Sequence, residues 1–373
     1  MLYKEIVKKV SVPANSKIKQ RDYLEKGAIA IVDQGQDLVG GYCDDPEKVI
    51  KCNLPVIVFG DHTRCVKYVD FPFCAGADGI KILAPRNDCN ARYLYYLTKY
   101  VAYKITNRGY ARHYQQVEKY DVFMPSSEEQ EKIVFYLEEV FSELDKGVET
   151  LQTIKQQLTV YRQAVLKKAF ENYEKWNKYV FSDLMEEVRN GYGRKPNDKG
   201  KYRILKISAV RPLKLNLAEN RYNQNPFSSE DTIVENDILF TRYNGSKEFV
   251  GVCAVVPHLD EPYAYPDKLI RCRPKIKSIV HSKFLVFYMN QGKARQYIRS
   301  KIKTTSGQNG ISGADIKKTV VYLPDMHIQA NIVEKIETRL SVCDSIEQTV
   351  DKALTQAEAM RQSILKKAFE GKL

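Results

Sequence analysis

Four polar loops of the chain combine cations with side-chain amides, and the first three also contain tyrosine. They lie at 106–116, 190–197, 241–247 and 303–313. Arginine and lysine hold phosphates, whereas asparagine, glutamine and arginine read base edges, so this mixture suits contact with nucleic acid. The alternative for each loop is a solvated surface with tyrosines that only pack. The candidate DNA-binding residues are Arg108, Tyr110, Arg112, His113, Gln116, Tyr192, Arg194, Lys195, Arg242, Tyr243, Asn244, Lys247, Lys303, Ser306, Gln308 and Asn309.

Residue patterns for catalysis or for a metal site are not found in the sequence. There is no GxxxxGK[ST] phosphate loop, and Gly191-Tyr192-Gly193 is only a fragment of a dinucleotide-binding fingerprint. The histidines form no HxH or HExxH pair, and the cysteines form no CxxC or CxxxC pair. No methyltransferase or metal-dependent nuclease motif accompanies the Asn-Pro and Pro-Asp steps. We therefore predict a binding protein with no catalytic residue, no metal ligand and no cofactor of its own.

A segment that occurs twice organises the chain. Residues 125–171 and 324–370 align without a gap at a constant offset of 199 residues. Both copies open with Pro-x4-Gln-x-x-Ile-Val and close with Arg-Gln-x-x-Leu-Lys-Lys-Ala-Phe-Glu. Neither copy has an internal proline, and a pair of lysines lies near the C-terminal end of each copy, which favours one long helix for each.

A heptad pattern fits both copies and predicts that the two helices pair as a coiled coil inside one chain. In the first copy the d positions are Leu137, Leu144, Leu151, Leu158 and Val165, and the a positions include Ile133, Val140, Ile154 and Tyr161. In the second copy the d positions are Ile336, Cys343, Val350, Ala357 and Ile364, and the a positions include Ile332, Ile346, Ala353 and Met360. Because like units most often associate about a twofold axis, we expect antiparallel helices and a pseudo-twofold repeat.

The rest of the sequence forms two similar α+β domains. Each has short β-like runs, then a helical segment (91–105 and 281–302), then a polar loop that leads into the repeat helix. The β-like runs lie at 28–32, 55–59, 66–69, 79–83, 202–207, 237–241, 249–256 and 268–272. The predicted boundaries are 1–124 for the first domain, 125–172 for the first helix, 173–323 for the second domain and 324–373 for the second helix.

The charge of the chain points to a polyanionic partner. Lysine and arginine outnumber aspartate and glutamate in the 373 residues, which gives a formal net charge of +13. The first residues do not form a signal peptide, and no apolar run approaches ~18 residues, so we expect a cytoplasmic protein without a membrane partner.

These features together resemble the specificity (S) subunit of a type I restriction-modification system. The most specific elements are the terminal Leu-Lys-Lys-Ala-Phe-Glu-Gly-Lys-Leu at 365–373, its echo at 166–171, and the Pro-x4-Gln-x-x-Ile-Val start of each helix. The resemblance implies two target-recognition domains that each read half of a bipartite double-stranded DNA site. It also implies that the two repeat helices form the spacer between them and contact the methyltransferase (M) subunits.

Catalysis is borrowed from partner subunits in that family. The resemblance implies two M subunits that carry S-adenosylmethionine and methylate adenine N6, and restriction (R) subunits that use ATP and Mg²⁺ to cleave foreign DNA in the prokaryotic cytoplasm. The chain begins almost directly in its first domain, which leaves open a trimmed N-terminus or a type II relative with a separate S subunit. The DNA target and spacer length do not follow from the sequence.

Two other classes of function remain as alternatives. One is a non-catalytic coiled-coil adaptor whose basic domains bind RNA or acidic proteins, and DNA binding that is absent for RNA would distinguish it. The other is a self-sufficient nuclease or methyltransferase, which activity of the isolated chain with S-adenosylmethionine would reveal.

Overall fold

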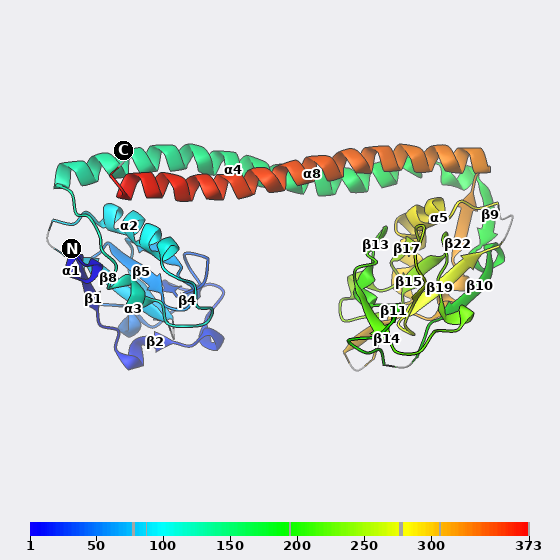
Figure 1. Ribbon diagram of the computed structural model, residues 1–373, viewed down its shortest axis with the longest axis horizontal. Coiled ribbons are helices and arrows are strands. Elements are labelled where there is room, and N and C mark those ends of the chain that lie inside the picture. The colour runs from blue at the N-terminus through cyan, green and yellow to red at the C-terminus, as the bar shows by residue number, and fades with distance from the viewer. Residues whose placement is uncertain (77–78, 87, 194, 276–278, 306, 372–373) are drawn as a thin grey trace. The chain divides into compact units, whose positions relative to one another are not determined.

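The protein is α+β and divides into two compact units (Figure 1). The computed structural model describes residues 1–76, 79–86, 88–193, 195–275, 279–305 and 307–371. Unit 1 comprises Met1–Ile154 and Thr349–Leu373, and unit 2 comprises Lys155–Gln348. The two repeat segments form the long helices α4 (Ser127–Ala169) and α8 (Met326–Phe369), and each helix contributes residues to both units.

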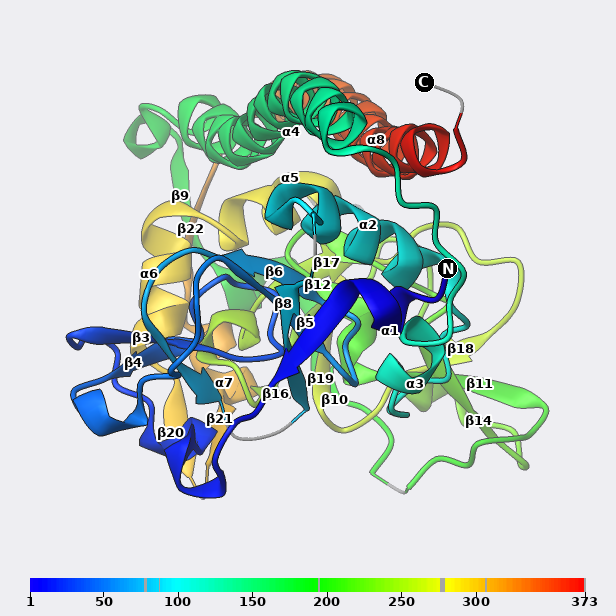
Figure 2. The ribbon, with the colours of Figure 1, turned by 90° about the vertical axis from the view of Figure 1, so that its left-hand side faces the viewer.

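Unit 1 contains two four-stranded sheets with the strand orders β1-β8-β5-β6 and β2-β7-β3-β4. Its strands are β1 (Val7–Val10), β2 (Lys17–Ile18), β3 (Ile29–Val32), β4 (Gly41–Cys43), β5 (Val56–Gly60), β6 (Val66–Val69), β7 (Phe73–Gly76) and β8 (Ile80–Pro85). Its shorter helices are α1 (Tyr3–Ile6), α2 (Ala91–Lys104) and α3 (Tyr114–Val117). Figure 2 shows α2 lying along the first sheet, beneath the ends of the long helices that belong to this unit.

The central strand β5 is buried on both faces because a packed layer lies on each side of it. Ile57 and Phe59 face a core formed by α2 and by residues of α4 and α8. Val56 and Val58 point the other way, into a second core shared with β3 and β7. Alternate side chains of a strand point to opposite faces, which explains why this short run is apolar throughout rather than alternating with polar residues.

Unit 2 has a main four-stranded sheet, β10-β19-β15-β17, and four smaller sheets. Its strands are β9 (Asn177–Val180), β10 (Met185–Asn190), β11 (Tyr202–Leu205), β12 (Val210–Arg211), β13 (Lys214–Leu215), β14 (Asn220–Asn223), β15 (Ile238–Thr241), β16 (Tyr243–Asn244), β17 (Cys253–Val255), β18 (Tyr263–Ala264), β19 (Leu269–Pro274), β20 (Lys303–Thr305), β21 (Gln308–Gly310) and β22 (Val320–Leu323). Its shorter helices are α5 (Ser282–Met289), α6 (Gly292–Ser300) and α7 (Gly313–Lys317).

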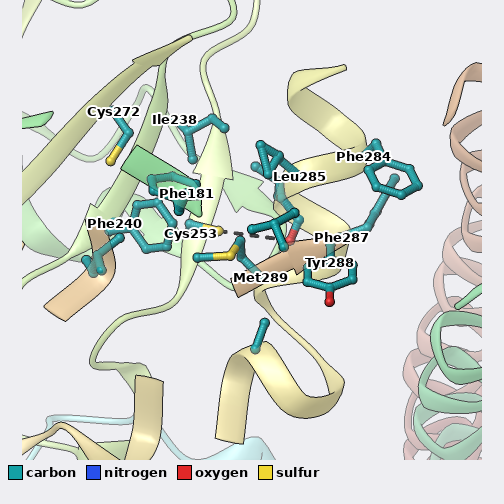
Figure 3. Packing of buried hydrophobic residues seen from close by; sticks show 14 of the residues in the cluster. Phe181, Ile238, Phe240, Cys253, Cys272, Phe284, Leu285, Phe287, Tyr288 and Met289 are labelled. Carbon is teal, nitrogen blue, oxygen red and sulfur yellow. Dashed lines mark hydrogen bonds between the residues drawn. The ribbon is translucent and has the colours of Figure 1, made fainter. Parts of the chain in front are cut away.

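The core of unit 2 lies between the main sheet and helix α5 (Figure 3). Phe240 of β15 meets Phe181 edge to face, with ring centroids 5.8 Å apart. On the helix, Phe284 and Tyr288 pack against Phe170 near the end of α4. The same apolar cluster therefore holds the sheet, α5 and the adjoining part of α4 together.

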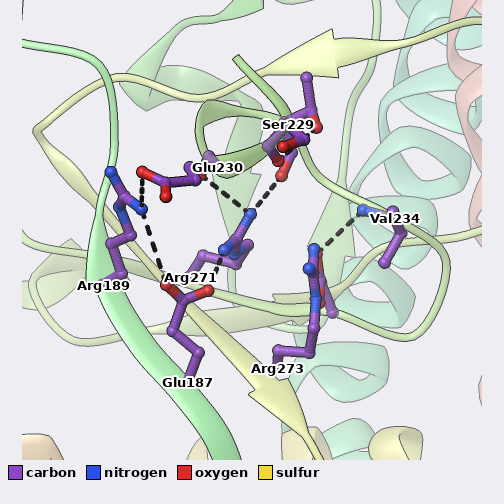
Figure 4. Close-up of polar contacts among 9 residues, drawn as sticks. Glu187, Arg189, Ser229, Glu230, Val234, Arg271 and Arg273 are labelled. Atoms are coloured by element: carbon purple, nitrogen blue, oxygen red, sulfur yellow. Dashed lines mark hydrogen bonds and ion pairs between the residues drawn. The ribbon is translucent and has the colours of Figure 1, made fainter.

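Two arginines of β19 fix the loop beside the main sheet of unit 2 (Figure 4). Arg271 of β19 is only 1% exposed, pairs with Glu187 of β10 and donates to the carbonyl oxygens of Glu230 (3.1 Å) and Thr232. Arg273 binds both carboxylate oxygens of Asp237 at 2.8 Å. Because bidentate, charge-assisted bonds fix geometry, these two arginines hold the 230–237 segment against the sheet.

The two long helices contact each other in both units, and the contacts correct part of the predicted heptad frame. The predicted d positions are buried or half-buried throughout. Three residues of the predicted a row are wrong, since Tyr161, Ile346 and Met360 are 48%, 41% and 54% exposed, whereas the other five are half-buried. At these three positions the next residue along the chain is less exposed (Arg162, Glu347 and Arg361), and this inward row also includes Val134, Phe141, Val333, Leu340 and Leu354.

Polar residues in this inward row are satisfied by ion pairs between the helices. In unit 2, Arg162 of α4 binds Asp344 (2.6 Å) and Glu347 (2.8 Å) of α8. In unit 1, Arg361 of α8 binds Asp145 of α4 and lies 4.7 Å from the ring centroid of Phe141. The row is therefore mixed, with apolar residues near the domains and charged pairs further along the helices.

Both long helices are tied to the preceding domain by an equivalent buried glutamine. Gln130 accepts from Asn90 N (2.8 Å) and donates to the carbonyl oxygens of Asp88 (3.2 Å) and Pro125 (3.0 Å). Gln329 accepts from His281 N (2.9 Å) and donates to the carbonyl oxygens of Ile279 and Pro324, both at 2.8 Å. Asn90 and His281 cap α2 and α5, so each glutamine joins the start of a repeat helix to the start of a domain helix.

Several predicted elements differ from the structure. The helical segment 281–302 is two helices, because the chain turns at Asn290 and Gln291 between α5 and α6. The run 249–256 contains only the short strand β17, since Gly251 adopts φ +69° and interrupts it. The 303–313 loop forms strands β20 and β21 rather than an irregular loop. Among the described residues, no helix combines the length and the apolar character needed to cross a bilayer.

Candidate nucleic-acid interface

Unit 2 contains a basic cavity where three of the predicted loops meet. Its volume is about 780 Å³. The loops come together because β16 pairs with β21, and because Tyr192 forms a bridge with Pro266 beside them. The cavity is lined by Gly193, Lys195, Pro196, Leu205, Lys206, Ile207, Ser208, Arg211, Arg221, Tyr243, Asn244, Gly245, Pro266, Asp267, Lys268 and Gln308.

Cations outnumber carboxylates around this cavity. Its lining contains five lysine or arginine side chains and one carboxylate, Asp267. Lys206 lies 3.5 Å from Glu219, whereas no described carboxylate lies within 4 Å of the amino or guanidinium groups of Lys195, Arg221 and Lys268. The unpaired cations give the cavity a positive field that suits a phosphate backbone.

Four of the predicted residues line this cavity and four others lie near it without lining it. Lys195, Tyr243, Asn244 and Gln308 are in the lining. Arg242 donates to the carbonyl oxygen of Asp267 (3.2 Å) and lies over the Tyr243 ring, so it supports the wall. Tyr192 packs edge to face on Phe227, while Lys303 and Lys247 are exposed. Arg194 and Ser306 lie outside the described residues.

Asn309 has a structural role that the sequence did not indicate. Its Oδ1 accepts from Thr304 Oγ1 (2.7 Å), and its Nδ2 donates to the carbonyl oxygen of Gly245 (2.9 Å). Both ends of the amide are therefore used to join β20, β21 and the 244–246 turn. Asn309 therefore helps to shape the sheet, and its contact with DNA stays a prediction.

In unit 1 the predicted DNA-binding loop, 106–116, has an exposed tip. Tyr110 is 82% exposed, and its ring stacks on His62 with centroids 4.4 Å apart and an interplanar angle of 7°. Arg108 and Arg112 are exposed on either side, and Gly109 adopts φ +66°, which glycine tolerates without strain. A flat ring between two cations can stack on bases while the cations hold phosphates.

His113 and Gln116 make hydrogen bonds that hold this loop in place. His113 has no exposed surface; its Nε2 accepts from Arg108 N (3.1 Å), so Nδ1 carries the proton and donates to the carbonyl oxygen of Asp61 (3.0 Å). The Gln116 amide donates to the carbonyl oxygen of Thr106 (3.2 Å). Both ring nitrogens of His113 are therefore satisfied inside the protein, and its contact with DNA stays a prediction.

Sequence reasoning missed the four cations of the cavity that lie outside the predicted loops. Lys206, Arg211, Arg221 and Lys268 are separated in the chain and join the site only through strand pairing. Their signal in the sequence is weak. Lys268, for example, is recognisable only as the residue that precedes the buried strand β19.

The loops before α3 and α7 occupy the same place in the repeat. The N-cap of α3 is His113 and that of α7 is Ser312, at the offset of 199 that relates the long helices. The duplication therefore extends into the domains, and the exposed loop of unit 1 and the β20–β21 hairpin of unit 2 are divergent versions of one segment.

Comparison with known proteins identifies the family. The type I restriction modification DNA specificity domain matches residues 4–159 and again residues 173–356. The chain is 37% identical to the EcoKI specificity subunit of Escherichia coli K12 over 266 residues, and 30% identical to the StySPI specificity subunit of Salmonella potsdam over 268 residues. Each alignment covers 67% of this chain, which spans 57% of the length of either relative.

A solved structure has the same fold over the whole chain. It comes from a study of complex assembly and conformational transition of the type I R-M system, and it superposes with a TM-score of 0.70 at 13% identity, covering 100% of this chain and 97% of its own. The duplicated match and the two relatives agree with this likeness of fold. The chain belongs to the family of the type I restriction modification DNA specificity domain.

Proposed function

We propose that the chain is the DNA-reading specificity subunit of a type I restriction-modification complex. The observation that carries the proposal is that the specificity domain matches twice, and that each match contains its own exposed, cation-rich segment. Two unlike reading segments on a duplicated framework suit a bipartite site in double-stranded DNA. Phosphate contacts by exposed cations give affinity, and base contacts by amides and arginines give specificity.

We assign the reading to two target-recognition domains, residues 1–124 and 173–323. Residues 125–172 and 324–373 form the spacer, an antiparallel intramolecular coiled coil with pseudo-twofold symmetry. Two duplicated contacts support this arrangement: the reciprocal Arg162–Asp344 and Arg361–Asp145 pairs, and the Gln130 and Gln329 bonds to domain helices. Equivalent residues that make equivalent contacts are what a twofold axis between two like units requires.

Catalysis belongs to partner subunits in this proposal. Two M subunits carry S-adenosylmethionine and methylate adenine N6, and R subunits that join through the complex use ATP and Mg²⁺. All of them act on DNA in the prokaryotic cytoplasm. The duplicated spacer suits this stoichiometry, because two copies of one partner need two copies of one docking surface.

The test is to co-express the chain with its M partner in a methylation-free host and to map the methylated adenines. The proposal predicts one bipartite sequence with a fixed spacer, methylated only when both chains are present. The purified complex should bind a duplex with that sequence and discriminate against random duplex and against RNA. Methylation that is independent of this chain, or equal binding of RNA, contradicts the proposal; the second result would favour an RNA-binding adaptor.

A further inference from the structure

The sheet β16-β21-β20 presents one face to the basic cavity of unit 2. Tyr243 and Lys303 both lie opposite Gly310 in the strand register. Gln308 is two residues from Gly310, and side chains two apart on a strand share a face. Tyr243, Lys303 and Gln308 therefore lie on the same face of this small sheet.

Glycine at position 310 allows the Tyr243 ring to lie flat on this face. A Cβ atom at Gly310 would come within 2.5 Å of the Tyr243 ring. The guanidinium of Arg242 lies 4.7 Å from the centroid of the same ring. Gln308 is the diagonal neighbour of Tyr243 across the strand pair, a position within reach of an aromatic side chain.

The Gln308 amide is exposed and uncommitted. The two asparagines of the sheet are engaged, since Asn309 bonds Thr304 and Gly245, and Asn244 Oδ1 accepts from Ser246 N (3.0 Å). Gln308 makes no side-chain hydrogen bond with another residue in the described part of the chain. It alone among these three amides can donate and accept toward the same ligand group.

Cations without carboxylate partners lie around this amide. Lys195, Arg221 and Lys268 line the same cavity and come from three other segments of unit 2. A β-ribbon fits the major groove of B-DNA, where adenine presents the N7 acceptor beside the N6 donor. A glutamine amide matches that pair, with its NH₂ group donating to N7 and its carbonyl oxygen accepting from N6.

We propose that Gln308 reads one adenine in the major groove of the half-site bound by the second domain. Lys195, Arg221 and Lys268 hold the flanking phosphates, and Asn309 is a positioning residue that keeps β20 and β21 in register. The inference rests on the proposed function and adds to it the base-reading residue and the base that it reads.

The experiment uses the full chain in complex with its M partner and the duplex found by methylation mapping. Each adenine on either strand is replaced in turn by 7-deazaadenine, which keeps base pairing but lacks the N7 acceptor. One replacement in the second half-site should weaken binding of the wild-type complex by roughly 5- to 150-fold, the range for one bidentate base contact. Gln308→Ala should weaken binding of the natural duplex similarly and should remove the sensitivity at that adenine alone.

Phosphate-contact variants provide the control. Arg221→Ala and Lys268→Ala should weaken binding to the site and to random duplex alike and lower the salt slope by about one each, whereas Gln308→Ala should leave the slope unchanged. If the wild-type complex discriminates its site but Gln308→Ala keeps every 7-deazaadenine effect, the assignment of Gln308 is wrong and the proposed function stands. If the wild-type complex does not discriminate its site from random DNA, the assignment of Gln308 and the proposed function are both overturned.

Discussion

Arg162 and Arg361 hold equivalent positions in the two long helices, and each pairs with the aspartate at the equivalent position of the other helix. Arg162 binds Asp344 in unit 2, and Arg361 binds Asp145 in unit 1. The offset of 199 residues relates the arginines to each other and the aspartates to each other. The same Arg–Asp contact therefore occurs twice. The arginine comes from α4 in unit 2 and from α8 in unit 1, and the other helix supplies the aspartate.

Removing either Arg–Asp pair should have a modest effect, and Arg162 keeps its second partner Glu347 when Asp344 is replaced. The arginines are 24% and 20% exposed at their side chains, so Asp344→Asn and Asp145→Asn should each cost about 0.5–1 kcal/mol, near the upper end for exposed pairs. Double-mutant cycles with Arg162→Met and Arg361→Met, followed by chemical denaturation, give the two coupling energies. Coupling at one site and none at the other would contradict equivalence of the two contacts.

The buried glutamines should matter far more than exposed ones on the same helix. Gln130→Ala leaves Asn90 N and two carbonyl oxygens without their partner, so we expect a loss of roughly 2–4 kcal/mol in the stability of unit 1. Gln157, also present in both repeats but exposed, is the matched control, and Gln157→Ala should change stability by less than about 0.5 kcal/mol. Equal effects of the two substitutions would show that the buried amide does not join the helices.

Acidification should destabilise unit 2 through His281. Burial lowers the pKa of the His281 imidazole, and nearby Lys283 lowers it further while Glu337 opposes this. The unfolded chain then binds a proton more readily than the folded one, so stability is present above the ordinary histidine pKa of about 6.5 and is lost as the pH falls below it. Denaturation at pH 7.5 and 5.5 should show a smaller loss for His281→Asn than for wild type. A loss of the same size in both proteins would exclude His281 as the cause.

The exposed tip of unit 1 should contribute phosphate contacts. Replacing Arg108 and Arg112 together by alanine should lower the slope of log affinity against log salt by about two, since each lost phosphate contact lowers it by about one. Lys132 and Lys146 are exposed on α4 and each is paired with a glutamate of the same helix, so their double alanine variant is the control. Titration of a fluorescent duplex at several salt concentrations measures the salt slopes of both double variants. An unchanged slope for the Arg108 and Arg112 variant would make this tip ordinary surface.

Local sequence predicted the long helices well and the site only in part. Prolines before each repeat and none within it place the helices within a few residues of Ser127–Ala169 and Met326–Phe369. The heptad frame was wrong at Tyr161 and Met360, because the inward-facing residues there are the charged neighbours Arg162 and Arg361, and a charge is read from sequence as exposed. Their partners lie on the other helix, so only the fold reveals that the charges are satisfied.

Long-range pairing explains the remaining differences between the sequence-based predictions and the structure. The 241–247 and 303–310 segments meet because β16 pairs with β21 across more than sixty residues of chain, which no local pattern encodes. His113 lies in a polar loop and reads as exposed, but Asp61 from a distant turn accepts its ring proton. Polar residues whose partners are far away in the sequence are those that sequence reasoning misplaces.

The most direct test of the central claim, that two domains read separate half-sites on a shared spacer, is a domain exchange. The second domain is replaced by that of a relative, with junctions at 170–176 and 322–324, and the adenines methylated by the chimera with its M partner are mapped. The account predicts that one half of the bipartite sequence changes while the other half and the binding of M subunits are retained. A simultaneous change of both halves, or loss of M binding by a folded chimera, would contradict it.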